Sequence, residues 1–268
     1  MTAGMELRDK VAIVTGGAGG IGQALAWRFV EEGARGVLVA DLGGTGAVVE
    51  RLGDRAVGFD GDVTDEATIR ALIARAEEAF GPVDLFCANA GVAVGIGLED
   101  DEAVWDLAFG VNIRSHIHAA RALVPGWVQR GEGYFLTTAS AAGMLTQIGS
   151  APYAVTKHAA VAFAEWLSVT YGDAGIRVSC LCPMGVNTPM LNAGVDSEEG
   201  VTAGDVVRAA GGVVEPEEVA DVVIDALREE RFLVLPHPEV LTFFQRKASD
   251  YDRWLAGMRR LQAAVVGA

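Results

Sequence analysis

Short apolar runs alternate along this chain with longer segments of helical periodicity. The apolar runs are candidate strands, and they lie at residues 11–15, 36–40, 55–60, 83–88, 133–139, 177–182 and 231–235. Most are apolar throughout, which is typical of parallel strands covered on both faces. The helical segments lie at residues 20–33, 65–80, 101–129, 152–173 and 216–229. This alternation predicts an α/β fold, a doubly wound and mainly parallel seven-stranded sheet with helices on both faces.

The 268 residues contain no internal repeat and no obvious linker, so we expect one domain over 1–268. Residues 184–214 are rich in glycine and polar side chains and follow the sixth run. A long loop at the carboxyl end of such a strand is usually functional, so we expect it to bind substrate. The end of the chain, about 239–268, is expected to be a helical tail. Its residues 239–262 predict an amphipathic helix that covers the core or contacts another subunit.

The composition disfavours several kinds of partner. The chain has 36 acidic and 21 basic residues and a formal net charge of −15, which repels nucleic acid and anionic membranes. No apolar run approaches the roughly 18 residues of a membrane span, and no signal peptide is recognisable, so we expect a cytoplasmic protein. The three cysteines and four histidines show no ligand spacing. We therefore expect no disulfide framework and no metal, with the histidines on helix surfaces or in loops.

A glycine-rich loop, TGGAGGIG, directly follows the first predicted strand and opens the first predicted helix. Such a turn lets the backbone approach a pyrophosphate, and the helix N-terminus offers free N–H groups. Alone, the pattern is also compatible with a tight turn. Its context predicts a dinucleotide site of the Rossmann type, built from Gly16, Gly20, Ile21 and Gly22.

Asp41 ends the second predicted strand, about 20 residues after the glycine loop, as a dinucleotide site requires. A carboxylate there can accept hydrogen bonds from the adenosine ribose and would repel a 2′-phosphate. Its neighbour Leu42 offers no guanidinium, and the loop holds no Arg or Lys. The sequence therefore predicts NAD in preference to NADP. Asp41 as the N-cap of the following helix is an alternative, and the two roles are compatible.

Further motifs follow in a fixed order. They are Thr15-Gly16 with Gly20-Ile21-Gly22, Asp62-Val63, Asn89-Ala90-Gly91, Asn112, Ser140, Tyr153-x-x-x-Lys157, and Pro183 with Thr188-Pro189. With these motifs the chain resembles the short-chain dehydrogenase/reductase family over nearly its whole length. The resemblance implies an oxidoreductase that transfers a hydride between a nicotinamide cofactor and a small molecule. It also implies a homo-oligomer, since family members are commonly homotetramers or homodimers.

The resemblance implies which residues surround the adenosine half of the cofactor. Asp62 and Val63 would lie beside the adenine. Asn89, Ala90 and Gly91 would lie by the adenosine ribose while steadying the sheet. A simple glycine turn after the fourth strand is the alternative for that tripeptide.

On the nicotinamide side, the resemblance implies contacts from Pro183, Val186 and Thr188, with the threonine hydroxyl near the carboxamide or phosphates. One residue departs from the family, which usually has Pro-Gly where this chain has Pro183-Met184. Met184 places a flexible apolar side chain near the predicted nicotinamide and substrate. We expect it to affect substrate specificity and not the catalytic chemistry.

Tyr153 and Lys157 stand four residues apart, on one face of a predicted helix. The resemblance makes Tyr153 the general acid or base of the reaction. A phenol has a pKa of about 10, and a cation within roughly 4–6 Å lowers it. We therefore expect Lys157 to lower the pKa of Tyr153 and to bind the nicotinamide ribose. The alternative from the residues alone is a surface pair.

Two further residues complete the predicted catalytic set. Ser140 ends the fifth strand and would hydrogen-bond the substrate oxygen, while Thr138 lies deeper on the same face as a supporting residue. The family role of Asn112 is to hold a water that connects Lys157 to solvent. A buried asparagine that satisfies a helix backbone group is an equally fair interpretation.

The expected substrate pocket has walls at residues 92–98, 141–148, 184–185 and 188–212, which are mainly small or apolar. No Arg or Lys occurs in them before Arg208. A carboxylate or phosphate would be expected to need a cationic clamp, so the sequence predicts an uncharged, hydrophobic secondary alcohol or ketone.

Three other functions stay open at this point. They are an NADP-dependent carbonyl or 3-oxoacyl-thioester reductase of the same family, a methyltransferase on a similar sheet, and a non-catalytic NAD-binding sensor. Asp41 argues against the first. The set of four predicted catalytic residues argues against the other two.

Overall fold

A parallel sheet forms the centre of the computed structural model, which describes residues 4–193 and 203–266. Its strands, in chain order, are β1 (Val11–Thr15), β2 (Gly36–Asp41), β3 (Ala56–Asp60), β4 (Leu85–Ala88), β5 (Gly133–Thr138), β6 (Ile176–Leu181) and β9 (Leu233–Val234). The spatial order is β3-β2-β1-β4-β5-β6-β9, and every neighbouring pair is parallel. The predicted seven-stranded doubly wound sheet is therefore confirmed.

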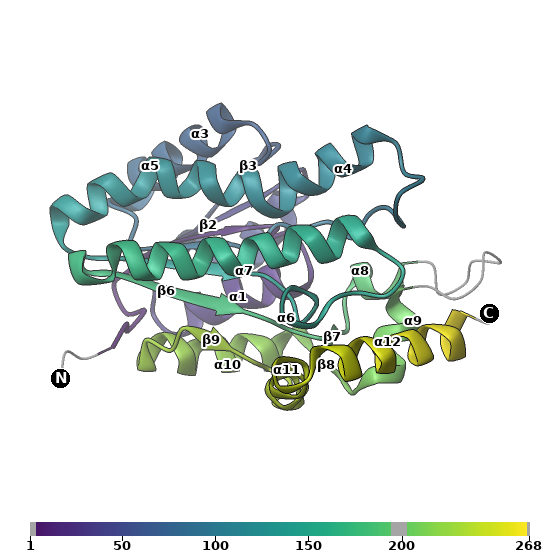
Figure 1. The fold of residues 1–268 in the computed structure, drawn as a ribbon. Helices are drawn as coiled ribbons and strands as arrows, with labels where there is room; N and C mark the ends of the chain where they lie inside the picture. Colours follow the sequence, from purple (N-terminus) through teal and green to yellow (C-terminus); the bar gives the residue numbers. More distant parts are fainter. Residues whose placement is uncertain (1–3, 194–202, 267–268) are drawn as a thin grey trace.

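Helices cover both faces of the sheet (Figure 1). One face carries α3 (Glu66–Phe80), α5 (Ser115–Arg130) and α7 (Ala151–Tyr171), and their apolar side chains share one buried cluster with the strands. A second cluster joins the other face to α1 (Gly20–Glu31) and α10 (Pro216–Glu229). Burial on both faces explains why most of the strands are apolar throughout.

The predicted helix over 101–129 is interrupted by a π-helical turn. It consists of α4 (Glu102–Phe109), the turn at Gly110–Arg114, and α5. A π-turn widens the helix locally, and such turns are frequent at functional sites. This one carries the predicted site residue Asn112, which is fully buried.

The C-terminal segment is two helices, so the prediction of a single helix over 239–262 is wrong. They are α11 (Glu239–Ser249) and α12 (Tyr251–Val266), separated at Asp250. Asp250 has an extended backbone (φ −156°, ψ 90°), and its carboxylate accepts the N–H of Arg253 at 3.0 Å. An aspartate in this role starts a new helix.

Several short elements were missed in the sequence. Helix α2 (Thr45–Leu52) lies among glycines that obscure its pattern. The segment 184–214 holds a small parallel pair, β7 (Gly185–Val186) with β8 (Val213–Val214), and the helices α8 (Pro189–Asn192) and α9 (Ala203–Ala210). Helix α6 (Ala142–Leu145) follows β5. Within the described ranges, no helix has the length and apolar character needed to cross a membrane.

Candidate active site

All strands point the same way, so their carboxyl ends meet at one edge of the sheet. The strand order reverses between β1 and β4, where this type of sheet opens a crevice for ligands. The glycine loop and the Asn89–Gly91 segment follow these two strands. The predicted cofactor residues therefore converge on the crevice.

The glycine loop has a shape that other residues would not tolerate. Gly16 and Gly20 have φ values of 64° and 52°, in the left-handed region. A Cβ on Gly22 would overlap the carbonyl oxygen of Gly16. The N-cap residue of α1, Gly19, has no side-chain cap, so the helix begins with backbone N–H groups at the loop. This cradle fits a pyrophosphate.

Asp41 ties the end of β2 to the glycine loop. Its carboxylate accepts the N–H of Ala18 at 2.9 Å and that of Leu42 at 2.8 Å. The N-cap of α2 is Gly44, so the alternative N-cap role for Asp41 is wrong. Because each carboxylate oxygen keeps a free lone pair, Asp41 is able to accept hydrogen bonds from ribose hydroxyls.

Asn89 connects the ends of three strands. Its amide donates to the carbonyl of Thr15 at 3.0 Å and accepts from the hydroxyl of Thr138 at 3.1 Å. The N–H groups of Asn89 and Ala90 both donate to the Thr15 hydroxyl. The steadying of the sheet at this edge is thus visible in the hydrogen bonds.

The remaining predicted cofactor residues surround the same edge. Val63 is buried in the core, and the carboxylate of Asp62 accepts the N–H of Thr64 at 2.9 Å. The methyl group of Thr188 would be 3.0 Å from a Cβ on Gly20, so this residue faces the glycine loop.

The end of β6 completes that part of the edge. Val186 is buried in β7. The carbonyl of Pro183 accepts the N–H of Ala141 at 2.8 Å. The segment after β6 is thereby joined to the residue that follows Ser140.

Tyr153 and Lys157 lie in the first two turns of α7. The helix begins there because Ser150 is its N-cap, with its hydroxyl accepting the N–H of Tyr153 at 3.4 Å, and because Pro152 stands in the first turn. The Lys157 Nζ lies 5.6 Å from the Tyr153 ring centroid. It is buried and donates to the carbonyl of Thr138 at 2.9 Å. The predicted shared face is confirmed.

The expected effect of Lys157 on Tyr153 is absent from this structure. Burial raises the pKa of Tyr153, and the Ser140 hydroxyl beside it opposes that rise. Burial also lowers the pKa of Lys157, to about 8. Desolvation is the largest cause of both shifts, and the ammonium is directed at the Thr138 carbonyl. Tyr153 therefore holds its proton at neutral pH.

Ser140 and Asn112 flank this pair. The Ser140 hydroxyl accepts the N–H of Ala142 at 3.1 Å. Asn112 accepts the N–H of Val92 at 2.8 Å and donates to its carbonyl at 3.0 Å, and also donates to the Thr156 hydroxyl at 3.0 Å. Asn112 thus holds the segment after β4, and its described partners include no direct bond to Lys157.

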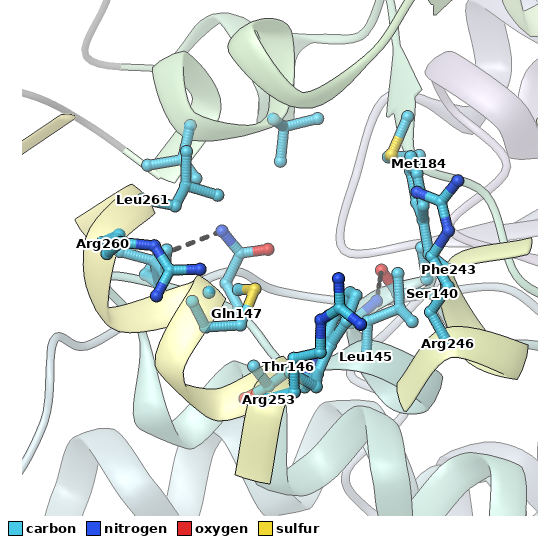
Figure 2. A pocket seen from close by; sticks show the side chains of 18 of the residues that line it. Ser140, Leu145, Thr146, Gln147, Met184, Phe243, Arg246, Arg253, Arg260 and Leu261 are labelled. Carbon is cyan, nitrogen blue, oxygen red and sulfur yellow. Dashed lines mark hydrogen bonds between the residues drawn. The ribbon is translucent and has the colours of Figure 1, made fainter. Parts of the chain in front are cut away.

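A cavity of about 720 Å³ opens beside Ser140 (Figure 2). Its walls include the expected segment 141–148 in most positions, together with Met184, Val206 and Val207. The segment 92–98 is not part of its lining. The other wall comes from the C-terminal helices α11 and α12, which the sequence did not predict.

These two helices bring charge to the cavity. Arg246, Arg253 and Arg260 all line it. The four expected segments indeed hold no Arg or Lys before Arg208, but the pocket wall also includes these three arginines, which were not predicted to lie there. The amphipathic pattern of residues 239–262 predicts that this segment covers the core or contacts another subunit, so its arginines are absent from the predicted pocket. The preference for an uncharged substrate therefore loses its basis.

Two buried polar residues support the cavity and carry no recognisable sequence motif. Lys247 of α11 donates to the carbonyl of Met144 at 2.7 Å and so anchors the C-terminal helices on α6. His237 accepts the N–H of Met184 at 3.1 Å and its other nitrogen lies 3.0 Å from the Gly185 carbonyl. His237 lies in the loop before α11, as predicted, although it is buried, whereas His116 is buried within α5 and the expected surface position is wrong for it.

Comparison with known proteins agrees with this geometry. The sequence profile described as short chain dehydrogenase matches residues 10–199. A 1-deoxy-11-beta-hydroxypentalenate dehydrogenase of Streptomyces exfoliatus is 36% identical over 250 residues, which cover 88% of this chain and 86% of that protein. A 2,5-dichloro-2,5-cyclohexadiene-1,4-diol dehydrogenase of Sphingobium indicum is 35% identical over 191 residues, covering 69% and 76%.

Solved structures lead to the same family. A short chain dehydrogenase/reductase from Burkholderia phymatum, in complex with NAD, has a TM-score of 0.83 and 31% identity, and the match covers 92% of this chain and 96% of that one. A 3-ketoacyl-(acyl-carrier-protein) reductase from Brucella melitensis, complexed with NADH, has a TM-score of 0.77 and 26% identity, covering 86% and 98%. This chain therefore belongs to the short-chain dehydrogenase family of oxidoreductases.

Proposed function

We propose that this protein is an NAD-dependent dehydrogenase that interconverts a hydrophobic, ring-bearing secondary alcohol and its ketone. The observation that carries the proposal is the convergence of Ser140, Tyr153 and Lys157 on the edge that holds the glycine loop and Asp41. A methyltransferase or an idle sensor would leave these three side chains without a role.

When bound, NAD supplies the hydride acceptor of the oxidation. Tyr153 takes the proton of the substrate hydroxyl, or returns it in the reverse direction. Ser140 hydrogen-bonds the substrate oxygen and holds it beside Tyr153. Lys157 binds the nicotinamide ribose, and Asn112 fixes the segment after β4 against α7.

The cofactor would be held by residues that line the crevice. The glycine-loop backbone would bind the pyrophosphate, Asp41 the adenosine ribose, and Asp62 and Val63 the adenine. Thr188 faces the loop from the opposite side, which fits a contact with the phosphates or the carboxamide.

The substrate class rests on the cavity and on the relatives. The lining is mainly apolar beside Ser140 and Met184. Two relatives are named for a hydroxypentalenate and a cyclohexadienediol. A secondary alcohol on a ring system suits both observations.

A homo-oligomer is also proposed. Helix α7 exposes Val155, Trp166 and Val169, and α4 exposes Leu107, which together offer apolar surface for a second copy. The cytoplasmic location and the single-domain organisation stay predictions.

Cofactor choice is tested by Asp41→Ala. Wild type should use NAD more efficiently than NADP, and the variant should shift the ratio of kcat/KM values toward NADP by at least about tenfold, because a like-charge contact with the 2′-phosphate is removed. The ratio is measured by steady-state kinetics with both cofactors. Asp54→Ala, an exposed aspartate remote from the crevice, is the matched control. Equal use of both cofactors by wild type contradicts the proposal.

The raised pKa of Tyr153 gives the reaction a directional pH dependence. The phenol is protonated at neutral pH and must lose its proton to act as a base. The kcat/KM for alcohol oxidation should therefore rise from neutral to alkaline pH, while that for ketone reduction should stay constant until the pH approaches the pKa of Tyr153 and fall above it. Both directions are measured by NADH absorbance. An oxidation rate that falls with rising pH would speak against Tyr153 as the base.

A further inference from the structure

Three arginines on the C-terminal helices line the substrate cavity. Arg246 lies in α11, and Arg253 and Arg260 lie in α12. Seven residues are close to two helical turns, so Arg253 and Arg260 share one face of α12, about 10 Å apart along its axis. In Figure 2 the guanidinium group of Arg246 lies beside Met184, and those of Arg253 and Arg260 lie nearer Gln147.

These guanidinium groups have no hydrogen-bond or ion-pair partner among the described residues. Among the described residues of the lining Asp250 alone is acidic, and its carboxylate accepts the backbone N–H of Arg253 at 3.0 Å. The described part of the cavity lining is therefore net positive, in a chain whose formal charge is −15. Unpaired arginines that face a cavity are suited to bind a carboxylate or phosphate in a bidentate manner.

The rest of the cavity suits an apolar body. Its apolar side chains come from several elements, and they include Leu145, Ile148, Met184, Trp254, Met258 and Leu261. A ligand that fills it places apolar atoms against these residues and an anionic group against the arginines, while its hydroxyl lies at Ser140.

We propose that the substrate is a hydrophobic alcohol that carries a carboxylate, which the arginines of α11 and α12 bind across the cavity from the reacting hydroxyl. The inference rests on the proposed dehydrogenase function of the same site. A carboxylate is favoured over the phosphate of a thioester carrier because the arginines line the same cavity as Ser140. All three arginines are exposed to solvent, so the anionic group would lie at the open side of the cavity while the apolar body lies against its wall.

The test compares acids with their neutral esters. NADH formation is measured with 4-hydroxycyclohexanecarboxylate and lithocholate, in which alcohol and carboxylate are set at different separations, and with the methyl ester of each. We expect kcat/KM for at least one acid to exceed that of its ester about 10- to 100-fold, the effect of hydrogen bonds to a charged group. Arg246→Gln, Arg253→Gln or Arg260→Gln should bring that ratio toward one.

The matched control is Arg259→Gln, because Arg259 precedes Arg260 on α12 and does not line the cavity. This variant should keep the wild-type ratio. Binding of each acid and ester to the protein with NADH, measured by calorimetry, tests the inference without turnover.

Equal affinity and equal kcat/KM for acid and ester would overturn the inference, as would an unchanged ratio in all three arginine variants. Preference for 3-hydroxybutyryl-CoA over the acids would overturn it as well. If the acids bind more tightly than the esters but no alcohol yields NADH with any probe, the dehydrogenase function fails and the carboxylate site stands.

Discussion

Tyr153→Phe should lower turnover about 10³-fold while leaving NAD affinity unchanged, because general acid–base catalysis commonly contributes 10²- to 10⁴-fold. The substitution removes only the hydroxyl that exchanges the substrate proton. The ring and its packing against the rest of α7 stay in place. Turnover is measured by NADH absorbance and NAD affinity by calorimetry.

The control for this variant is Tyr171→Phe, at the other end of α7, where the ring packs edge-on against Trp166. It should retain wild-type turnover. If Tyr153→Phe retains most of its turnover, then Tyr153 is not the acid or base, and the catalytic assignment fails.

Lys157→Met should abolish most activity and also stabilise the folded protein. The Lys157 pKa of about 8 lies below its ordinary value of 10.5. Each pKa unit corresponds to 1.36 kcal/mol, so holding the buried ammonium costs about 3 kcal/mol at neutral pH. Methionine fills a similar volume without a charge, so the free energy of unfolding at pH 7 should increase. Loss of the ammonium should weaken NAD binding and lower kcat.

The sign of the pH dependence follows from linkage. Between about pH 8 and 10.5 the unfolded chain binds a proton at Lys157 that the folded protein has released. The free energy of unfolding of wild type should therefore increase relative to that of Lys157→Met as pH rises through this window. Thermal unfolding of both proteins at pH 7 and at alkaline pH measures the difference. If the variant is less stable than wild type at pH 7, burying the Lys157 ammonium has no net cost in folding free energy, which contradicts this prediction.

Much of the fold was predictable because it follows from burial. Strands covered on both faces must be apolar throughout, and that pattern marked the position of most strands of the main sheet. The site residues at the carboxyl edge of the sheet were also predictable, because their positions follow from those of the strands. Gly16, Asp41 and Asn89 occupy the ends of strands, where the backbone has to meet a ligand.

The C-terminal part could not be predicted in the same way. An amphipathic pattern shows that a helix covers something, and it does not show which surface. Asp250, an N-cap inside the segment, was the sign that two helices were present. The arginines that α11 and α12 bring to the cavity depend on how these helices fold back, which is a tertiary property.

The electrostatics of the catalytic pair also required the structure. Spacing placed Lys157 one turn from Tyr153, but the effect of the ammonium depends on where it points and how deeply both groups are buried. Lys157 donates to the Thr138 carbonyl, and desolvation dominates the pKa of Tyr153.

The most direct test of the account is whether hydrogen passes from the alcohol carbon to NAD. The chain is incubated with NAD and a ring-bearing secondary alcohol that is deuterated at the carbinol carbon, and the reduced cofactor is analysed by mass spectrometry. The account predicts that each NADH formed carries the deuterium and that Tyr153→Phe forms almost none. NADH without deuterium, or no NADH from any secondary alcohol, would contradict it.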